Sequence, residues 1–184
     1  LVLTIGYLIT EAERIWLTLS DGRAVEGHGL AYDYDTGFGL VQILGKVDMP
    51  FLSIGQSRNT KVGDQVVMGA GGGRQRSVAA QVAGRQEFAG YWEYVLDDAI
   101  FTAPSHPNWG GTAMIGSKGE LLGIGSLQLE QGSGKTKGGH LNLVVPIDLL
   151  PTILDDMMRH GRADKAAGVH VHRGHGLGLL DDDM

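Results

Sequence analysis

The sequence has no cysteine, no long apolar segment and no excess of positive charge. Without cysteine the chain cannot form disulfides, zinc–thiolate sites or iron–sulfur clusters, and it cannot use a thiol nucleophile. No run approaches the roughly 18 apolar residues of a membrane-spanning helix, so we expect no membrane span. With 15 Lys and Arg against 21 Asp and Glu the net charge is −6, which argues against nucleic acid or an anionic lipid surface as a partner. The partner classes that remain are peptides, proteins and small molecules.

Glycine is abundant, with 30 residues spread along a chain of 184. Short apolar runs separated by glycines are typical of strands joined by tight turns, where positive φ is needed. Ten predicted strands lie at residues 2–10, 15–19, 24–32, 39–43, 65–69, 78–83, 94–102, 112–115, 121–129 and 141–145. Residues 146–160 instead repeat apolar side chains at helical spacing after a proline, with Gly161 as a C-cap. We therefore expect an all-β barrel or sandwich closed by one C-terminal α-helix.

The two ends of the chain differ from this pattern. The chain begins at Leu1 inside an apolar run, without methionine or a charged leader, and we interpret it as a fragment. Residues 161–184 have little apolar periodicity and are expected to form a flexible tail or linker. The tail carries His170, His172 and His175, which give one hypothesis of a metal-binding accessory protein. We predict no metal, because a solvated, mobile tail explains these histidines better.

Two glycine-rich loops have some features of nucleotide-binding motifs. Residues 132–136 read Gly-Ser-Gly-Lys-Thr, but the phosphate-binding loop needs a glycine where this chain has Leu129. Residues 69–73 lack the strand–turn–helix setting of a dinucleotide site. No Gly-x-Ser-x-Gly motif of the hydrolase type is present either. We predict no cofactor.

Another set of motifs lies in a fixed order along residues 2–161. They are Val-Leu-Thr-Ile-Gly-Tyr-Leu-Ile at 2–9, Ile-Trp-Leu-Thr-Leu-Ser-Asp-Gly-Arg at 15–23, Asp-Tyr-Asp-Thr-Gly-Phe-Gly-Leu-Val-Gln-Ile at 33–43, Ile-Gly-Gln-Ser at 54–57, Val-Gly-Asp-Gln-Val-Val at 62–67, Pro-Asn-Trp-Gly-Gly-Thr-Ala-Met-Ile at 107–115, Gly-Glu-Leu-Leu-Gly-Ile at 119–124 and Leu-Asn-Leu-Val-Val-Pro at 141–146. Their order and spacing resemble the trypsin-like protease domain of the HtrA/Deg family.

This resemblance implies a trypsin-like double β-barrel with a C-terminal α-helix. The N-terminal barrel is expected to be incomplete, because the family has further strands before the segment at 2–9. The implied division is a partial N-terminal barrel lobe at 1–64, a C-terminal barrel lobe at 65–146, the helix at 147–160 and the tail at 161–184.

The family's catalytic triad is replaced at every position. The resemblance places Tyr7 at the histidine, Gly37 at the aspartate and Gly110 at the serine. An ordinary phenol has a pKa near 10 and is a poor base at neutral pH, and glycine offers no nucleophile. We therefore predict a pseudoprotease that binds peptides or unfolded proteins, or acts in regulation. The alternative is an active serine endopeptidase with relocated residues, although Ser105 and His106 are neighbours on an extended chain and would point in opposite directions.

The family's oxyanion-hole amides correspond by this resemblance to Asn108 and Gly110. Such a pair of amides could still bind a carbonyl or a carboxylate without cleavage, or the glycines could only shape the loop. Other candidates for a peptide site lie around them, at His106, Trp109, Gly111 and Thr112. Trp109 is expected to fill the emptied site, with an exposed aromatic platform as the alternative.

The resemblance also carries expectations about the setting of the protein. It implies an extracytoplasmic, periplasmic location in a bacterium. It further implies a homo-oligomer assembled through N-terminal segments of the full-length protein.

Overall fold

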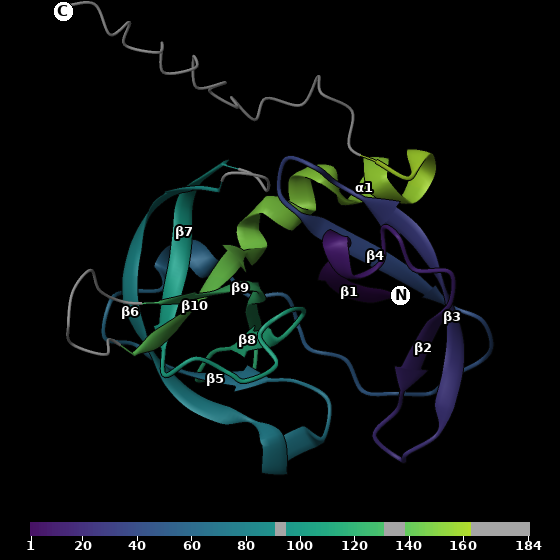
Figure 1. Cartoon of the computed structure of the whole chain (residues 1–184), viewed down its shortest axis with the longest axis horizontal. Coiled ribbons are helices and arrows are strands. Elements are labelled where there is room, and N and C mark those ends of the chain that lie inside the picture. Colours follow the sequence, from purple (N-terminus) through teal and green to yellow (C-terminus); the bar gives the residue numbers. More distant parts are fainter. Residues whose placement is uncertain (91–94, 131–138, 163–184) are drawn as a thin grey trace, which may run out of the picture.

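The computed structural model describes residues 1–90, 95–130 and 139–162. Within these ranges the chain forms two β-sheets followed by one α-helix, and Figure 1 shows the sheets side by side with the helix along one end of both. The expected all-β fold with a C-terminal helix is confirmed. No helix in these ranges is long and apolar enough to cross a membrane.

The N-terminal sheet has four antiparallel strands in the order β1-β4-β3-β2. They are β1 (Val2–Ile5), β2 (Ile15–Thr18), β3 (Ala24–Tyr32) and β4 (Phe38–Ile43). The sheet does not close on itself, so the expected incomplete N-terminal barrel is confirmed. Its two outer strands, β1 and β2, each pair with one neighbour among the described residues.

The first strand is shorter than predicted, because the backbone turns at Gly6. After Ile5 the chain enters a 3₁₀ turn, η1 (Gly6–Leu8), in which the amide of Gly6 donates to the carbonyl of Gly37 at 2.8 Å. A Cβ at residue 6 would lie 2.0 Å from the ring of Tyr32, so only glycine fits this approach. The position of Tyr7 is therefore set by this 3₁₀ turn and not by a continuous strand.

The C-terminal sheet is a closed barrel in the order β10-β7-β6-β5-β8-β9. Its strands are β5 (Gln65–Gly69), β6 (Val78–Ala89), β7 (Val95–Ala103), β8 (Ala113–Ile115), β9 (Leu121–Glu130) and β10 (His140–Pro146). Alternate side chains point inward and form an apolar core that includes Met68, Val82 and Met114. β6 continues six residues beyond its predicted end at 83, because its second half pairs with β7 as far as Ala89.

The C-terminal helix joins the two sheets. A 3₁₀ turn, η4 (Ile147–Leu149), leads into α1 (Leu150–His160), and Gly161 caps the helix at φ +74°. Ile153 and Met157 of α1 are buried in one apolar cluster with Phe38 of the N-terminal sheet and Leu143 of the barrel. The two lobes therefore share a core, which holds the surfaces between them in place.

Candidate functional site

The three positions predicted to correspond to the family's catalytic triad lie where the N-terminal sheet faces the barrel. Gly37 lies in the turn between β3 and β4, and its carbonyl holds the amide of Gly6, the residue before Tyr7. The phenol oxygen of Tyr7 lies 2.7 Å from the point that a Cβ at residue 110 would occupy. The structure thus brings Tyr7, Gly37 and Gly110 together, although they are far apart in the sequence.

Tyr7 reaches across from one lobe to the other. Its side chain is 42% exposed, and its hydroxyl donates a hydrogen bond of 2.5 Å to the carbonyl of Ser126 on β9. The next nearest atoms to the Cβ position of residue 110 are the methyl carbons of Leu8, at 3.6 Å. A side chain at 110 would therefore enter space that the Tyr7 hydroxyl already occupies.

The turn that carries Gly37 is stabilised from within. The buried carboxylate of Asp33 accepts bonds from the amide of Thr36 at 2.8 Å and from its hydroxyl at 2.6 Å. Gly37 itself has φ +80° and donates its amide to the carbonyl of Asp33 at 2.9 Å. The carboxylate of Asp33 thus serves the turn, in the manner of an Asx-turn, and none of its described hydrogen bonds goes to a histidine.

His106 anchors the loop that leads to Gly110. Its ring is 1% exposed, its Nδ1 accepts the amide of Asn108 at 3.0 Å, and its Nε2 lies 2.7 Å from the carbonyl of Arg76. Because an amide can only donate, Nδ1 must be the acceptor, so Nε2 carries the hydrogen and donates to Arg76. The backbone amide of His106 also donates to the side-chain oxygen of Asn142 on β10, at 2.7 Å. Through these hydrogen bonds the buried His106 connects its own loop with Arg76 and with Asn142 on β10.

This arrangement bears on the candidate amide pair. The amide of Asn108 points at the His106 ring, so it is not available to a bound carbonyl or carboxylate in this conformation. Gly111, at φ +77°, donates its amide to the carbonyl of Gly125 at 2.8 Å, and the hydroxyl of Thr112 donates to the carbonyl of Trp109 at 2.9 Å. The loop is thus braced against β9, and the Trp109 side chain remains 37% exposed.

Ser105 and His106 do not form a hydrogen-bonded pair in this structure. The hydroxyl of Ser105 accepts from the side-chain amide of Gln128 at 2.8 Å, while both ring nitrogens of His106 have backbone partners. A base must reach the proton that it removes, and this imidazole is buried and occupied.

The candidate metal ligands are not described by the structure. His170, His172 and His175 lie outside the described residues. Elsewhere, within residues 1–90, 95–130 and 139–162, no group of three or more metal-ligating side chains is present.

An open strand edge lies next to Tyr7, and no motif in the sequence indicates it. β9 pairs with β10 along most of its length, but with β8 only as far as Ile124, because β8 has three residues. In the described part of the chain, Ser126–Glu130 has no strand on the other side. The carbonyls of Gly125 and Ser126 both point to this side, where Gly111 and Tyr7 bind them, because the register of β9 against β10 shifts here and makes Ser126 the extra residue of a bulge. Beyond the bulge the regular alternation resumes, and the backbone groups two residues after Ser126 point the same way as its carbonyl. The N–H and C=O of Gln128 therefore face the open edge.

A cleft also opens beside Asn108. It holds about 750 Å³ and lies between the β2–β3 hairpin, at Leu19, and the loop after β5, at Arg76. The sequence predicts only a glycine-rich loop at residues 69–73. The cleft could not be expected from it, because its walls come from both lobes.

Comparisons with known proteins agree with the fold and with the order of the sequence motifs. A family model described as "Trypsin-like peptidase domain" matches residues 1–124. Serine endoprotease DegS of Salmonella typhimurium is 27% identical over 199 residues, which cover 96% of this chain and 52% of that protein. A probable periplasmic serine endoprotease, DegP-like, of Pseudomonas putida is 25% identical over 169 residues, covering 89% of this chain and 34% of its own length. The chain spans about half or less of the length of these relatives.

The fold is similar to that of solved structures as well. The structure titled "HtrA-type protease AlgW with decapeptide" matches with a TM-score of 0.71 and 21% identity, covering 88% of this chain and 49% of its own. At 21% identity this match supports a similarity of fold alone.

Proposed function

The chain belongs to the trypsin-like peptidase domain family, with HtrA-type proteases among its relatives, and from this premise we propose that it is a catalytically silent member that binds peptides. The observation that carries the proposal is the contact at the nucleophile position. Gly110 has no side chain there, and the Tyr7 hydroxyl lies 2.7 Å from where one would begin.

The proposed loss of catalysis follows from what the triad mechanism requires. Acyl transfer needs a hydroxyl nucleophile, a base that accepts its proton and a carboxylate that orients the base. At these positions the chain has a glycine, a phenol that donates to the Ser126 carbonyl, and a second glycine. His106, on the same loop as Gly110, has both ring nitrogens bound to backbone.

The proposed binding rests on the open edge of β9. An extended peptide can add a strand to such an edge, with main-chain hydrogen bonds supplying affinity. Tyr7 already occupies the Ser126 carbonyl, so the N–H and C=O of Gln128 are the groups that would pair with the incoming strand. A decapeptide accompanies the related HtrA-type protease AlgW, according to that structure's title, which favours the same class of ligand here.

Digestion of unfolded casein tests the loss of catalysis. We expect no cleavage by the natural chain and no labelling by a serine-reactive phosphonate. Cleavage together with a labelled residue would refute the proposal and identify the relocated nucleophile. The triple variant Tyr7→His, Gly37→Asp, Gly110→Ser is the comparison, and cleavage by it alone would support an intact cleft. Its thermal unfolding is measured first, because a side chain at φ +80° costs about 1 kcal/mol.

Fluorescence anisotropy of labelled, reduced casein peptides tests the binding edge. Gln128→Pro removes one N–H from the open side of β9, where proline is tolerated because no neighbouring strand needs that donor. We expect this variant to lose binding. The matched control is Gln128→Ala, which loses the bond to Ser105 but keeps the backbone N–H, and which should bind like the natural chain. Equal binding by the two variants would contradict strand addition at this edge.

We also propose an extracytoplasmic location, since the Pseudomonas putida relative is named periplasmic. We propose that the lobes at 1–64 and 65–146 act as one unit. The resemblance also leads us to expect a homo-oligomer, which analytical ultracentrifugation can test.

A further inference from the structure

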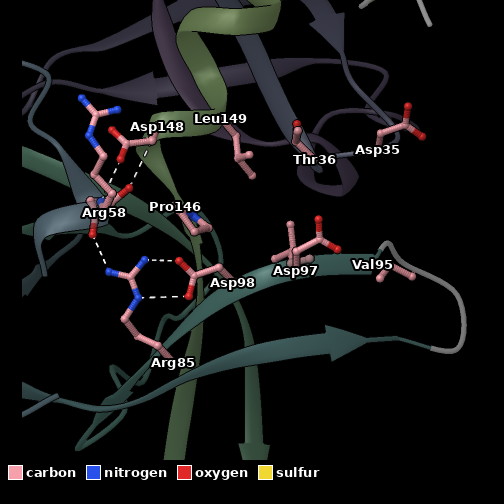
Figure 2. Close-up of a pocket in the computed structure, with 12 residues that line it drawn as sticks. Asp35, Thr36, Arg58, Arg85, Val95, Asp97, Asp98, Pro146, Asp148 and Leu149 are labelled. Atoms are coloured by element: carbon pink, nitrogen blue, oxygen red, sulfur yellow. Dashed lines mark hydrogen bonds and ion pairs between the residues drawn. The ribbon is translucent and has the colours of Figure 1, made fainter. Parts of the chain in front are cut away.

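A small pocket lies between the two lobes and includes none of the altered triad positions. It holds about 170 Å³. The β3–β4 turn lines one side of the pocket with Asp35 and Thr36. Residues of β7, β10 and η4 line other sides. Figure 2 shows Thr36 and Leu149 across an open space from Asp97 and Val95 on β7.

The inside of this pocket is apolar. Leu96 is buried beneath it, and Val95, Pro146 and Leu149 line its wall. Pockets for metabolites usually hold about 300–1,000 Å³, so a pocket of about 170 Å³ suits one side chain rather than a cofactor or a metabolite. The apolar wall suits the methylene stem of such a side chain.

The rim of the pocket is acidic, and two of its carboxylates have no protein partner. Asp98 is paired with Arg85, and Asp148 accepts the backbone amide of Arg58 at 2.7 Å. Asp35 and Asp97 make no hydrogen bond or ion pair within residues 1–90, 95–130 and 139–162. The lining also includes Arg58, so four carboxylates stand against the two guanidinium groups of Arg58 and Arg85, and a net negative charge is left at the opening.

Arg85 shows that this rim already holds one cation. Its side chain is 15% exposed, and its guanidinium binds the Asp98 carboxylate and the carbonyls of Ser57 and Thr60, at 2.6 and 2.7 Å. Figure 2 shows this ion pair at one side of the opening, with Asp97 next to Asp98 on the same strand. The pocket beside it offers the same combination of acidic groups and apolar wall, but no side chain of residues 1–90, 95–130 or 139–162 fills it.

We infer that this pocket binds a lysine or arginine side chain of a partner polypeptide, with its stem against Leu149 and Pro146 and its charge at Asp35 and Asp97. Long basic side chains commonly bury the stem on apolar surface and leave the head at the rim. A bare metal ion would leave the apolar wall unused, and an apolar side chain would leave the two carboxylates without a cation. Because the walls come from both lobes, an occupant would contact both of them.

NMR titration of the natural chain with N-acetyl-lysine methylamide tests this inference. We expect saturable shifts confined to the methyl groups of Val95, Leu96 and Leu149, with arginine methylamide giving the same pattern. The norleucine analogue has the stem without the charge and should bind at least about fivefold more weakly, from two half-exposed charge contacts. A glutamate analogue should leave these methyl groups unshifted.

The double variant Asp35→Asn, Asp97→Asn should weaken lysine binding by about the same factor. Its matched control is Asp48→Asn, Asp155→Asn, which changes the net charge equally at exposed sites outside the pocket and should bind as the natural chain does. Equal weakening by both double variants, or norleucine binding as tightly as lysine, would overturn the inference. Thermal unfolding of both double variants serves to check that they are folded. The variant Gln128→Pro should still show the lysine-induced shifts, which separates this pocket from the proposed peptide edge of β9.

Discussion

The contact between Tyr7 and Gly110 can be measured by a double-mutant cycle. The two perturbations are Gly110→Ala, which adds a Cβ 2.7 Å from the Tyr7 hydroxyl, and Tyr7→Phe, which removes that hydroxyl. If the two residues meet as the structure shows, the cost of the added methyl should depend on whether the hydroxyl is present.

The magnitudes follow from the contacts. In the natural background the added methyl overpacks the site and costs about 1–3 kcal/mol. This is offset by roughly 0.4–1 kcal/mol, because alanine reduces the freedom of the unfolded chain and Gly110 is outside the positive-φ region. Tyr7→Phe loses the bond to the Ser126 carbonyl and costs about 1 kcal/mol. In the double variant the clash is gone and only the unfolded-chain effect of alanine is left, so its free energy of unfolding should exceed that of Tyr7→Phe alone by roughly 0.4–1 kcal/mol.

Urea unfolding followed by tryptophan fluorescence, to which Trp109 next to Gly110 contributes, provides the four free energies. We expect the double variant to be more stable than additivity predicts, by about 1 kcal/mol or more. The control cycle combines Gly110→Ala with Tyr34→Phe, an exposed tyrosine on the β3–β4 turn, and should be additive within about 0.5 kcal/mol. Additivity in the Tyr7 cycle as well would refute the contact and, with it, the argument that Tyr7 occupies the nucleophile position.

Three further predictions concern single residues. Arg85→Met should lower the free energy of unfolding by about 2 kcal/mol in urea, since it leaves two carbonyls and a carboxylate without their donor. Arg23→Met, which removes an exposed ion pair, should leave the free energy of unfolding nearly unchanged, and equal costs for the two variants would contradict the assignment. Thr102→Val should leave the free energy of unfolding unchanged or raised, because the buried Thr102 hydroxyl has no hydrogen-bond partner in the part of the chain that the structure describes, and a loss above about 1 kcal/mol would reveal one. The backbone amide and then the guanidinium of Arg23 hold the pKa of Asp21 below its ordinary value, so NMR titration should show that pKa rise in Arg23→Ala; the small stabilisation from this pair is present above the unfolded-state pKa and is lost as the pH falls through the folded-state pKa.

Local sequence patterns predicted most of the strands and the helix, and the errors lie where a distant partner intervened. The strand predicted at 2–10 ends at Ile5, because Gly6 packs beneath Tyr32. The strand predicted at 78–83 continues to Ala89, because β7 supplies partners for polar residues that have no apolar alternation of their own. Strand length is thus set by pairing as well as by composition.

The sequence alone determined the properties that depend on residue identity and order. The repeated short strands, the absence of cysteine and the lack of a hydroxyl at Gly110 can all be read without coordinates, as can the resemblance of the motif order to a known family. The tertiary structure alone decided the relations across long sequence separations. The Tyr7 hydroxyl meets the Ser126 carbonyl 119 residues away, the His106 ring takes the Asn108 amide, and Asp35 and Leu149 line one pocket. The physical reason is that periodicity encodes which face of an element is buried, whereas these contacts depend on how two lobes pack against each other.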